Sequence, residues 1–117
     1  MNILKFIKET PIIQIRSEYD LNYTGISIVV VNKRIFARVG KLGSNGWYDY
    51  FLKKPNGEIK INDKTFPIKA VIPIELKNIN TKINEAFHTK YGQIYRSKNF
   101  IVNKPFVIHH ILEFILI

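Results

Sequence analysis

The segment from Arg38 to Trp47 brings together the residue types that hold an anion. It contains three glycines, the last of which is Gly46, together with Lys41 and Ser44. Glycine-rich backbone can direct several amides at one point, where two cations add full charge and a hydroxyl adds a donor. Trp47 could then stack beside a ring attached to the anion. The pattern predicts a phosphate or sulfate site, although its glycine spacing matches neither a Walker loop nor a dinucleotide-binding fingerprint.

The alternative is an ordinary loop in which Trp47 belongs to the core and Arg38 pairs with Asp49 or Glu85. No catalytic constellation is visible elsewhere. There are no cysteines, which excludes disulfides and thiol catalysis. His109 and His110 are neighbours in an expected strand, so they point to opposite faces and no metal site is predicted from them.

The expected elements place this segment between a strand and a helix. A helix over residues 1–10 is ended by Pro11, and Asn32-Lys33 joins two apolar runs into a hairpin. We expect Ser44 or Asn45 to cap the helix that follows the loop, and Asn80 or Thr81 to cap a later one. The dense Ile and Val of the hairpin's first strand indicate burial on both of its faces. The predicted helices span residues 1–10, 44–54 and 81–91, and the predicted strands span 12–16, 25–31, 34–39, 58–61, 65–74 and 106–117.

Strands interrupted by short helices are typical of an α+β protein with a mainly antiparallel sheet, here one that curls into a barrel with short flanking helices. With 117 residues, 46% of them hydrophobic, the chain is expected to be a single globular domain over 1–117. No apolar run approaches the length of a membrane span, and no signal peptide is recognisable, so a cytoplasmic location is expected.

Three stretches resemble a bacterial family known as domain of unknown function 2255: residues 35–48, the alternating strand from Gly57, and residues 83–92. The resemblance extends over residues 10–116. It implies a split β-barrel like that of the FMN-binding pyridoxamine-phosphate oxidases and the deazaflavin-dependent nitroreductases. In those relatives the cofactor phosphate is held at a strand-to-helix connection, often across a dimer interface. The matching positions in this sequence are Arg38, Lys41, Ser44 and Lys90, so the resemblance implies FMN or a related flavin, a homodimer, and an oxidoreductase only by analogy.

The net charge of +9 has two explanations. A surface that attracts nucleic acid or another polyanion is one. The other is codon composition, because 14 of the 18 cations are lysines and the chain is also rich in Ile and Asn, whose codons are rich in A and T. Dedicated nucleic-acid surfaces usually depend on arginine. A cofactor-free binding or structural module and a small nucleic-acid-binding barrel therefore remain alternatives to a flavin protein.

Overall fold

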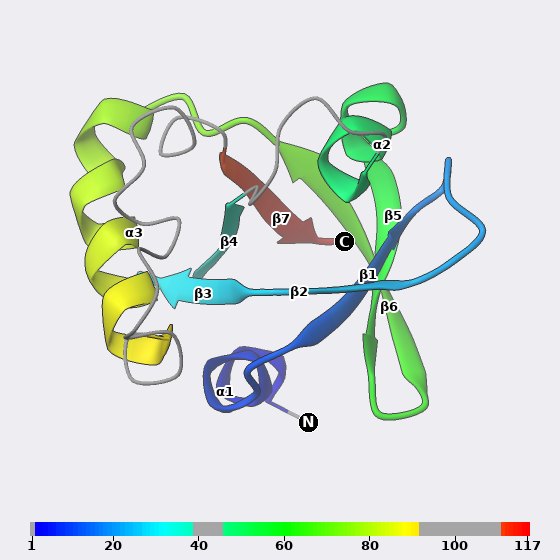
Figure 1. Cartoon of the computed structure of the whole chain (residues 1–117), viewed down its shortest axis with the longest axis horizontal. Helices are drawn as coiled ribbons and strands as arrows, with labels where there is room; N and C mark the ends of the chain where they lie inside the picture. The colour runs from blue at the N-terminus through cyan, green and yellow to red at the C-terminus, as the bar shows by residue number, and fades with distance from the viewer. Residues whose placement is uncertain (1, 39–45, 92–110) are drawn as a thin grey trace.

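The computed structural model describes residues 2–38, 46–91 and 111–117 (Figure 1). These ranges form three helices around one antiparallel sheet of seven strands. In chain order the elements are α1 (Ile3–Glu9), β1 (Ile13–Ser17), β2 (Thr24–Ile26), β3 (Ile28–Val31), β4 (Arg34–Arg38), α2 (Trp47–Lys53), β5 (Asn56–Ile61), β6 (Lys64–Val71), α3 (Leu76–Tyr91) and β7 (Ile111–Leu116).

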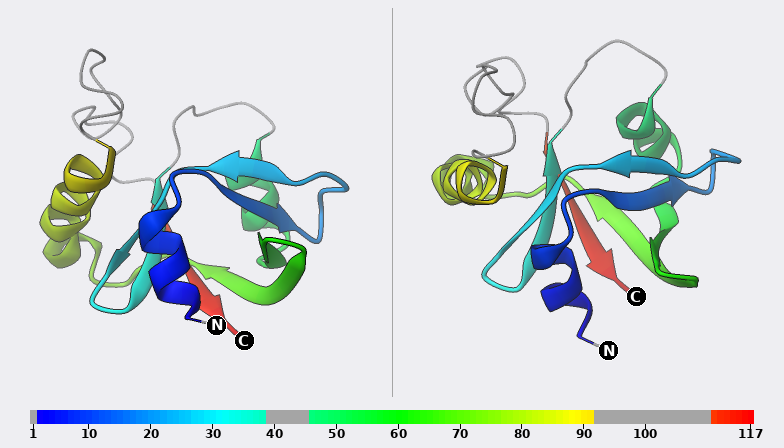
Figure 2. Two further views of the ribbon diagram at one scale, coloured as in Figure 1. Left: turned by 90° about the horizontal axis from the view of Figure 1, so that it is seen from below. Right: turned by 60° about the horizontal axis from the view of Figure 1, so that its bottom comes forward.

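The sheet curls into a nearly closed barrel. Its strand order is β2-β1-β5-β6-β7-β4-β3, and every neighbouring pair is antiparallel. The two outermost strands, β2 and β3, follow one another in the chain with only Ser27 between them. This arrangement confirms the predicted α+β split barrel with flanking helices (Figure 2). The prediction of one strand over 25–31 was wrong, because the chain passes from one end of the sheet to the other at Ser27.

The predicted hairpin is confirmed as β3–β4. Val31 pairs with Arg34, which leaves two residues in the turn. Those residues, Asn32 and Lys33, have φ values of 51° and 65°. Positive φ at both central positions is the geometry of a type I′ turn, whose twist matches that of the flanking strands. The hairpin therefore has a fixed register, which determines which side chains of β3 and β4 face each side of the sheet.

Two apolar clusters lie on the two faces of β3 and β4. The interior cluster fills the barrel and includes Ile28, Ile35 and Ala37. The α3 cluster lies between the sheet and α3 and consists of Val29, Val31, Phe36, Ile79, Ile83, Phe87, Tyr91 and Ile111. Burial of β3 on both faces, which its Ile and Val content predicted, is confirmed. Figure 2 shows α3 alongside this part of the sheet, while α2 lies over another side of the barrel.

Several element boundaries differ from those predicted. The N-cap of α2 is Gly46, without a side-chain hydrogen bond, rather than Ser44 or Asn45. Helix α3 begins at Leu76, so Asn80 and Thr81 lie within it. The carbonyl of Glu75 accepts the amides of Asn78 and Ile79, at 2.9 and 3.0 Å, and these bonds form the first turn. Strand β6 ends at Val71 rather than at residue 74, and β7 is described from Ile111; the predicted residues 106–110 lie outside the described ranges.

Candidate functional site

Arg38 is the charged residue that the fold buries most deeply among the described positions. It is the last residue of β4 and pairs with Ile111 of β7. The residue is only 3% exposed, and its guanidinium carbon lies 5.1 Å from the centre of the Phe87 ring on α3. Its Nη2 donates a 3.1 Å hydrogen bond to Asn80 Oδ1. Nε and Nη1 are buried and have no hydrogen-bond acceptor among the residues that the structure describes.

Arg38 also lacks a carboxylate partner in the described ranges. Arg16 forms an ion pair with Glu58, and Arg34 contacts both Glu75 and Glu113. These carboxylates raise the pKa of both arginines. Burial instead lowers the pKa of Arg38 to about 10, because removal from water disfavours the charged form. The group is still charged at neutral pH. Within the described ranges, this desolvated cation therefore has one side-chain hydrogen bond, to the neutral amide of Asn80.

The structure does not place all of the other predicted anion ligands beside Arg38. Trp47 packs against the interior cluster, with its ring centre 6.3 Å from that of Phe114 and 6.0 Å from that of Tyr48. Arg38 instead lies over Phe87 of the α3 cluster, so the two residues contact different clusters.

Gly46 caps α2 with a φ of −109°. Lys41 and Ser44 lie outside the described residues. Asn80, which sequence reasoning treated only as a helix cap, is the residue that contacts Arg38.

Lys90 is engaged elsewhere. Its Nζ donates to the carbonyls of Ile7 and Ile28, each at 2.6 Å. The ammonium therefore joins the C-terminal turn of α3 to α1 and to the edge of β3, and no contact with Arg38 is found among the described residues. Burial lowers the pKa of Lys90 to about 8. The expected grouping of Lys90 with Arg38 is therefore not found among the described residues, where the half-buried Lys90 and the buried Arg38 have different partners.

The lowered pKa of Lys90 gives an expected pH dependence. The folded state releases this proton near pH 8, whereas the usual pKa is 10.5, so between these values the unfolded state holds more protons. The free energy of unfolding of the wild type should therefore rise, relative to Lys90→Met, as the pH increases through this window. Below pH 8 the folded protein carries the charge of Lys90, and the cost of partly removing this charge from water lowers the free energy of unfolding. Denaturation at several pH values and NMR titration of the Lys90 side chain check this, and a titration midpoint at 10.5 or above would contradict it.

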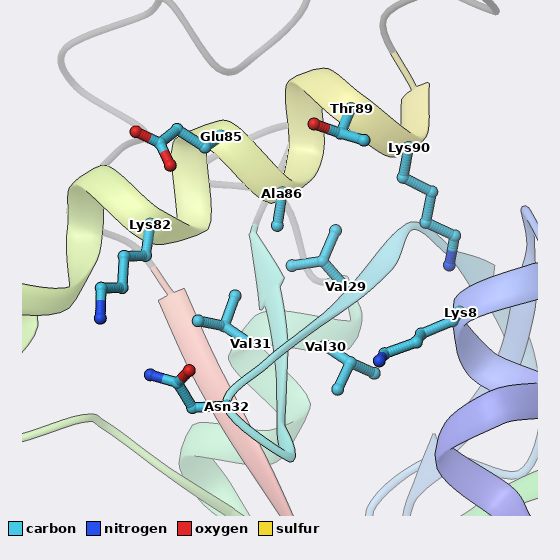
Figure 3. A pocket seen from close by; sticks show the side chains of 10 residues that line it. All are labelled: Lys8, Val29, Val30, Val31, Asn32, Lys82, Glu85, Ala86, Thr89 and Lys90. Carbon is cyan, nitrogen blue, oxygen red and sulfur yellow. The ribbon is translucent and has the colours of Figure 1, made fainter.

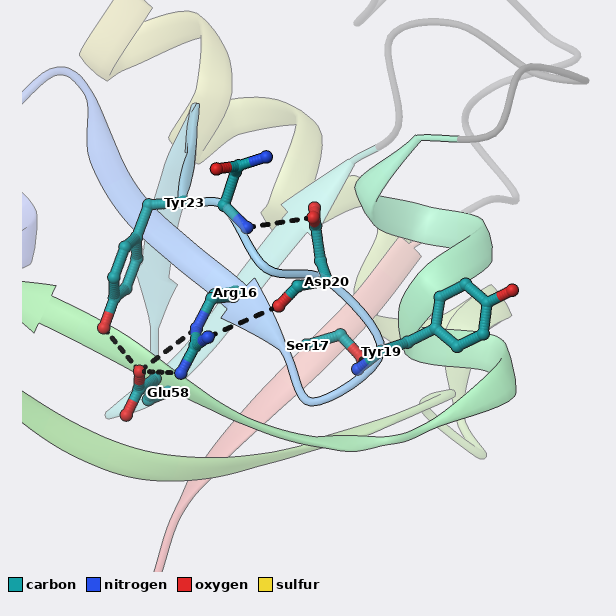
Figure 4. A network of polar contacts seen from close by, with 7 residues as sticks. Arg16, Ser17, Tyr19, Asp20, Tyr23 and Glu58 are labelled. Carbon is teal, nitrogen blue, oxygen red and sulfur yellow. Dashed lines mark hydrogen bonds and ion pairs between the residues drawn. The ribbon is translucent and has the colours of Figure 1, made fainter.

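A polar network on β1 and β5 was not predicted (Figure 4). Arg16 and Glu58 are cross-strand partners, and Arg16 Nη2 lies 2.7 Å from Glu58 Oε1. The hydroxyl of Tyr23 donates to the same carboxylate oxygen, and Arg16 Nη1 donates to the carbonyl of Asp20 at 3.4 Å. The pKa of Glu58 is lowered, first by Tyr23 and then by Arg16, and both residues donate to the same oxygen, Oε1. This network fixes the connection between β1 and β2. The sequence does not reveal this network, because Arg16 and Glu58 become neighbours only through the register of β1 on β5.

Other site types find no support among the described residues. Within these ranges no three His, Asp or Glu side chains are grouped as metal ligands would be. His88 lies exposed on α3. None of the helices in the described part of the chain is both long and apolar enough to span a bilayer. The expectations of a homodimer and of a cytoplasmic location stay predictions.

Comparison with known proteins agrees with the sequence resemblance. A model of the family described as "Uncharacterized protein conserved in bacteria (DUF2255)" matches residues 4–108. This match includes β1 to β6 and all of α3, and therefore both Arg38 and Lys90. A search of curated proteins finds no match. Because the family model covers most of the sequence, the chain belongs to this family of uncharacterised bacterial proteins, domain of unknown function 2255.

Proposed function

We propose that this protein binds a phosphate-bearing small molecule and that Arg38 receives its anionic group. FMN or a related flavin is the first candidate, because the split barrel resembles that of flavin-binding proteins. The observation that carries the proposal is the Arg38 guanidinium, which is 3% exposed as a residue, has two unsatisfied nitrogens and has no carboxylate partner within the described ranges. Arginine is also the side chain best suited to bind phosphate oxygens through several hydrogen bonds.

The free energy of the ligand-free protein supports this assignment. A buried charge with no partner costs several kcal/mol, and each buried donor left without an acceptor adds about 1–3 kcal/mol. Such a cost is difficult to explain if Arg38 acts only in packing, because methionine could fill a similar volume without charge. An anion that binds only the folded state would offset this cost and stabilise the fold by mass action.

The substitution Arg38→Met separates a ligand-binding role from a structural one. Without ligand, we expect the variant to be at least as stable as the wild type, and up to about 1–4 kcal/mol more stable, because it removes a buried charge that has no carboxylate partner in the described ranges. With FMN at about one hundred times its Kd, the wild type should gain about 2.7 kcal/mol, whereas the variant should gain almost nothing. Thermal denaturation and quenching of flavin fluorescence measure the two effects.

Lys64→Gln is the control for net charge, since Lys64 is exposed at the start of β6. It should retain FMN binding. Riboflavin, which lacks the phosphate, should bind much more weakly than FMN. The proposed function is overturned if neither FMN nor inorganic phosphate at about ten millimolar stabilises the wild type, or if Arg38→Met binds FMN as the wild type does. A marked loss of stability in ligand-free Arg38→Met would identify Arg38 as a structural residue instead.

A further inference from the structure

A groove of about 560 Å³ lies between α1, β3 and α3 (Figure 3). We call it the β3 groove. Its volume is within the range of small-molecule sites. The side chains of Lys8 and Lys90 reach into it from α1 and α3, on either side of β3. Its other lining residues include Val29–Asn32 from β3 and the following turn, and Lys82, Glu85 and Ala86 from α3.

The free edge of β3 lies in this groove. Among the described strands, β3 is at one end of the order and has β4 as its single neighbour. The amide of Ile28 donates to the Tyr91 hydroxyl at 3.0 Å, and its carbonyl accepts from Lys90 Nζ, so the polar groups of Ile28 point away from β4. In an antiparallel pair this orientation recurs every second residue. The amide and carbonyl of Val30 therefore point into the groove, while those of Ile28 are already occupied.

The charges around the groove favour an anion. Three lysines line it, Lys8, Lys82 and Lys90, against the single carboxylate of Glu85. Lys90 uses two of its three N–H donors on backbone carbonyls, which leaves the third for a ligand. None of these lysines forms an ion pair with a carboxylate among the described residues. Between the cations, the half-buried Val30 and Ala86 and the small exposed part of Val31 provide an apolar surface, whereas Val29 is only 1% exposed.

We propose that the β3 groove binds a small organic anion with an apolar body, such as a medium-chain carboxylate. The carboxylate would accept from Lys8, Lys90 and the Val30 amide, and the apolar body would lie against Val31 and Ala86. A small molecule fits better than an added peptide strand, because the edge offers only one free residue between the occupied Ile28 and the turn at Asn32-Lys33. Arg38 does not line this groove, so the proposal is independent of the phosphate site.

Binding of octanoate to the uniformly ¹⁵N-labelled protein tests the proposal by NMR. Octanoate should shift the amide signals of Val29–Val31, Ala86 and Thr89. Acetate lacks the apolar chain and octanol lacks the negative charge, so each should bind at least tenfold more weakly. Lys8→Gln should weaken octanoate about three- to tenfold, because it removes one exposed cation of the pair. Ala86→Phe should abolish the shifts by filling the groove.

Lys64→Gln again controls for net charge and should leave octanoate binding unchanged. Arg38→Met should also leave it unchanged, which separates failure of this proposal from failure of the phosphate site. A well-dispersed spectrum of Ala86→Phe shows that the variant is folded. The proposal is overturned if octanoate at about ten millimolar causes no shifts around the β3 groove, or if the shifts persist in Ala86→Phe. It is likewise overturned in favour of strand addition if a hexaglutamate peptide binds the groove more tightly than octanoate.

Discussion

Replacing Gly57 with alanine is expected to destabilise the protein by about 3 kcal/mol or more, which is at the upper end for overpacking. Gly57 pairs with Ser17 at the end of the antiparallel ladder between β1 and β5. A Cβ atom at this position would overlap the backbone carbonyl of Arg16 and would lie 2.8 Å from Cε1 of the Phe51 ring. A backbone carbonyl in a strand ladder cannot move aside without breaking the pairing of β1 with β5. Chemical denaturation measures the loss.

Gly25→Ala provides the matched control. At this position the new Cβ would meet side-chain atoms, Cγ2 of Ile12 at 2.6 Å and Nε2 of Gln14 at 3.2 Å. Ile12 is 45% exposed, so its side chain can rotate away. We expect a loss of about 1 kcal/mol or less for Gly25→Ala. Equal losses for the two variants would show that Gly57 is not required for close approach of the strands.

Removing the hydroxyl of Tyr91 should cost about 2–4 kcal/mol, because the buried amide of Ile28 and the part-buried carbonyl of Pro11 each lose a partner. The hydroxyl accepts from the Ile28 amide at 3.0 Å and donates to the Pro11 carbonyl at 2.6 Å. The residue is fully buried, so water cannot replace these bonds without rearrangement. Tyr91→Phe retains the ring and its stacking on Phe87, at 5.8 Å between ring centres, and therefore isolates the effect of the hydroxyl.

Tyr19→Phe is the control for Tyr91→Phe. Tyr19 is 48% exposed, and its loss of a hydroxyl should change stability by less than about 0.5 kcal/mol. Hydrogen exchange should also report the difference, with faster exchange of the Ile28 amide in Tyr91→Phe. A stability of Tyr91→Phe within 0.5 kcal/mol of the wild type would mean that the hydroxyl does not join α3 to the edge of β3.

Local patterns predicted most elements of the barrel correctly. The Asn32-Lys33 turn and the β-branched runs beside it determined the β3–β4 hairpin, since the turn type and the side-chain alternation agree. The start of α3 was predicted too late because Asn80 resembles a cap. The row formed by Ile83, Phe87 and Tyr91 extends back to Ile79, which is 6% exposed, and this periodicity was the signal for an earlier start.

The candidate site was predictable only in part. Arg38 was selected because it ends a strand before a glycine-rich loop; in the structure it is buried and has no carboxylate partner within the described ranges. Arg38 and Asn80 are 42 residues apart in the sequence, and their contact depends on how α3 packs on the sheet. The role of Gly57 was also missed, because Pro55-Asn56-Gly57 is typical of a turn. Gly57 instead lies in β5, where the backbone of β1 leaves no room for a Cβ atom. No local sequence pattern indicates this close approach.

The position of β7 affects when the sheet can form during protein synthesis. β7 follows every other described strand in the chain, yet it lies between β6 and β4 in the sheet. A nascent chain that ends before residue 111 has the four-stranded ladder β2-β1-β5-β6 and the β3–β4 hairpin, but no strand to join them across the barrel. The ribosome must therefore deliver residues 111–116 before the seven-stranded sheet can be completed, and the Arg38 position at the β4–β7 boundary is among the last to be assembled.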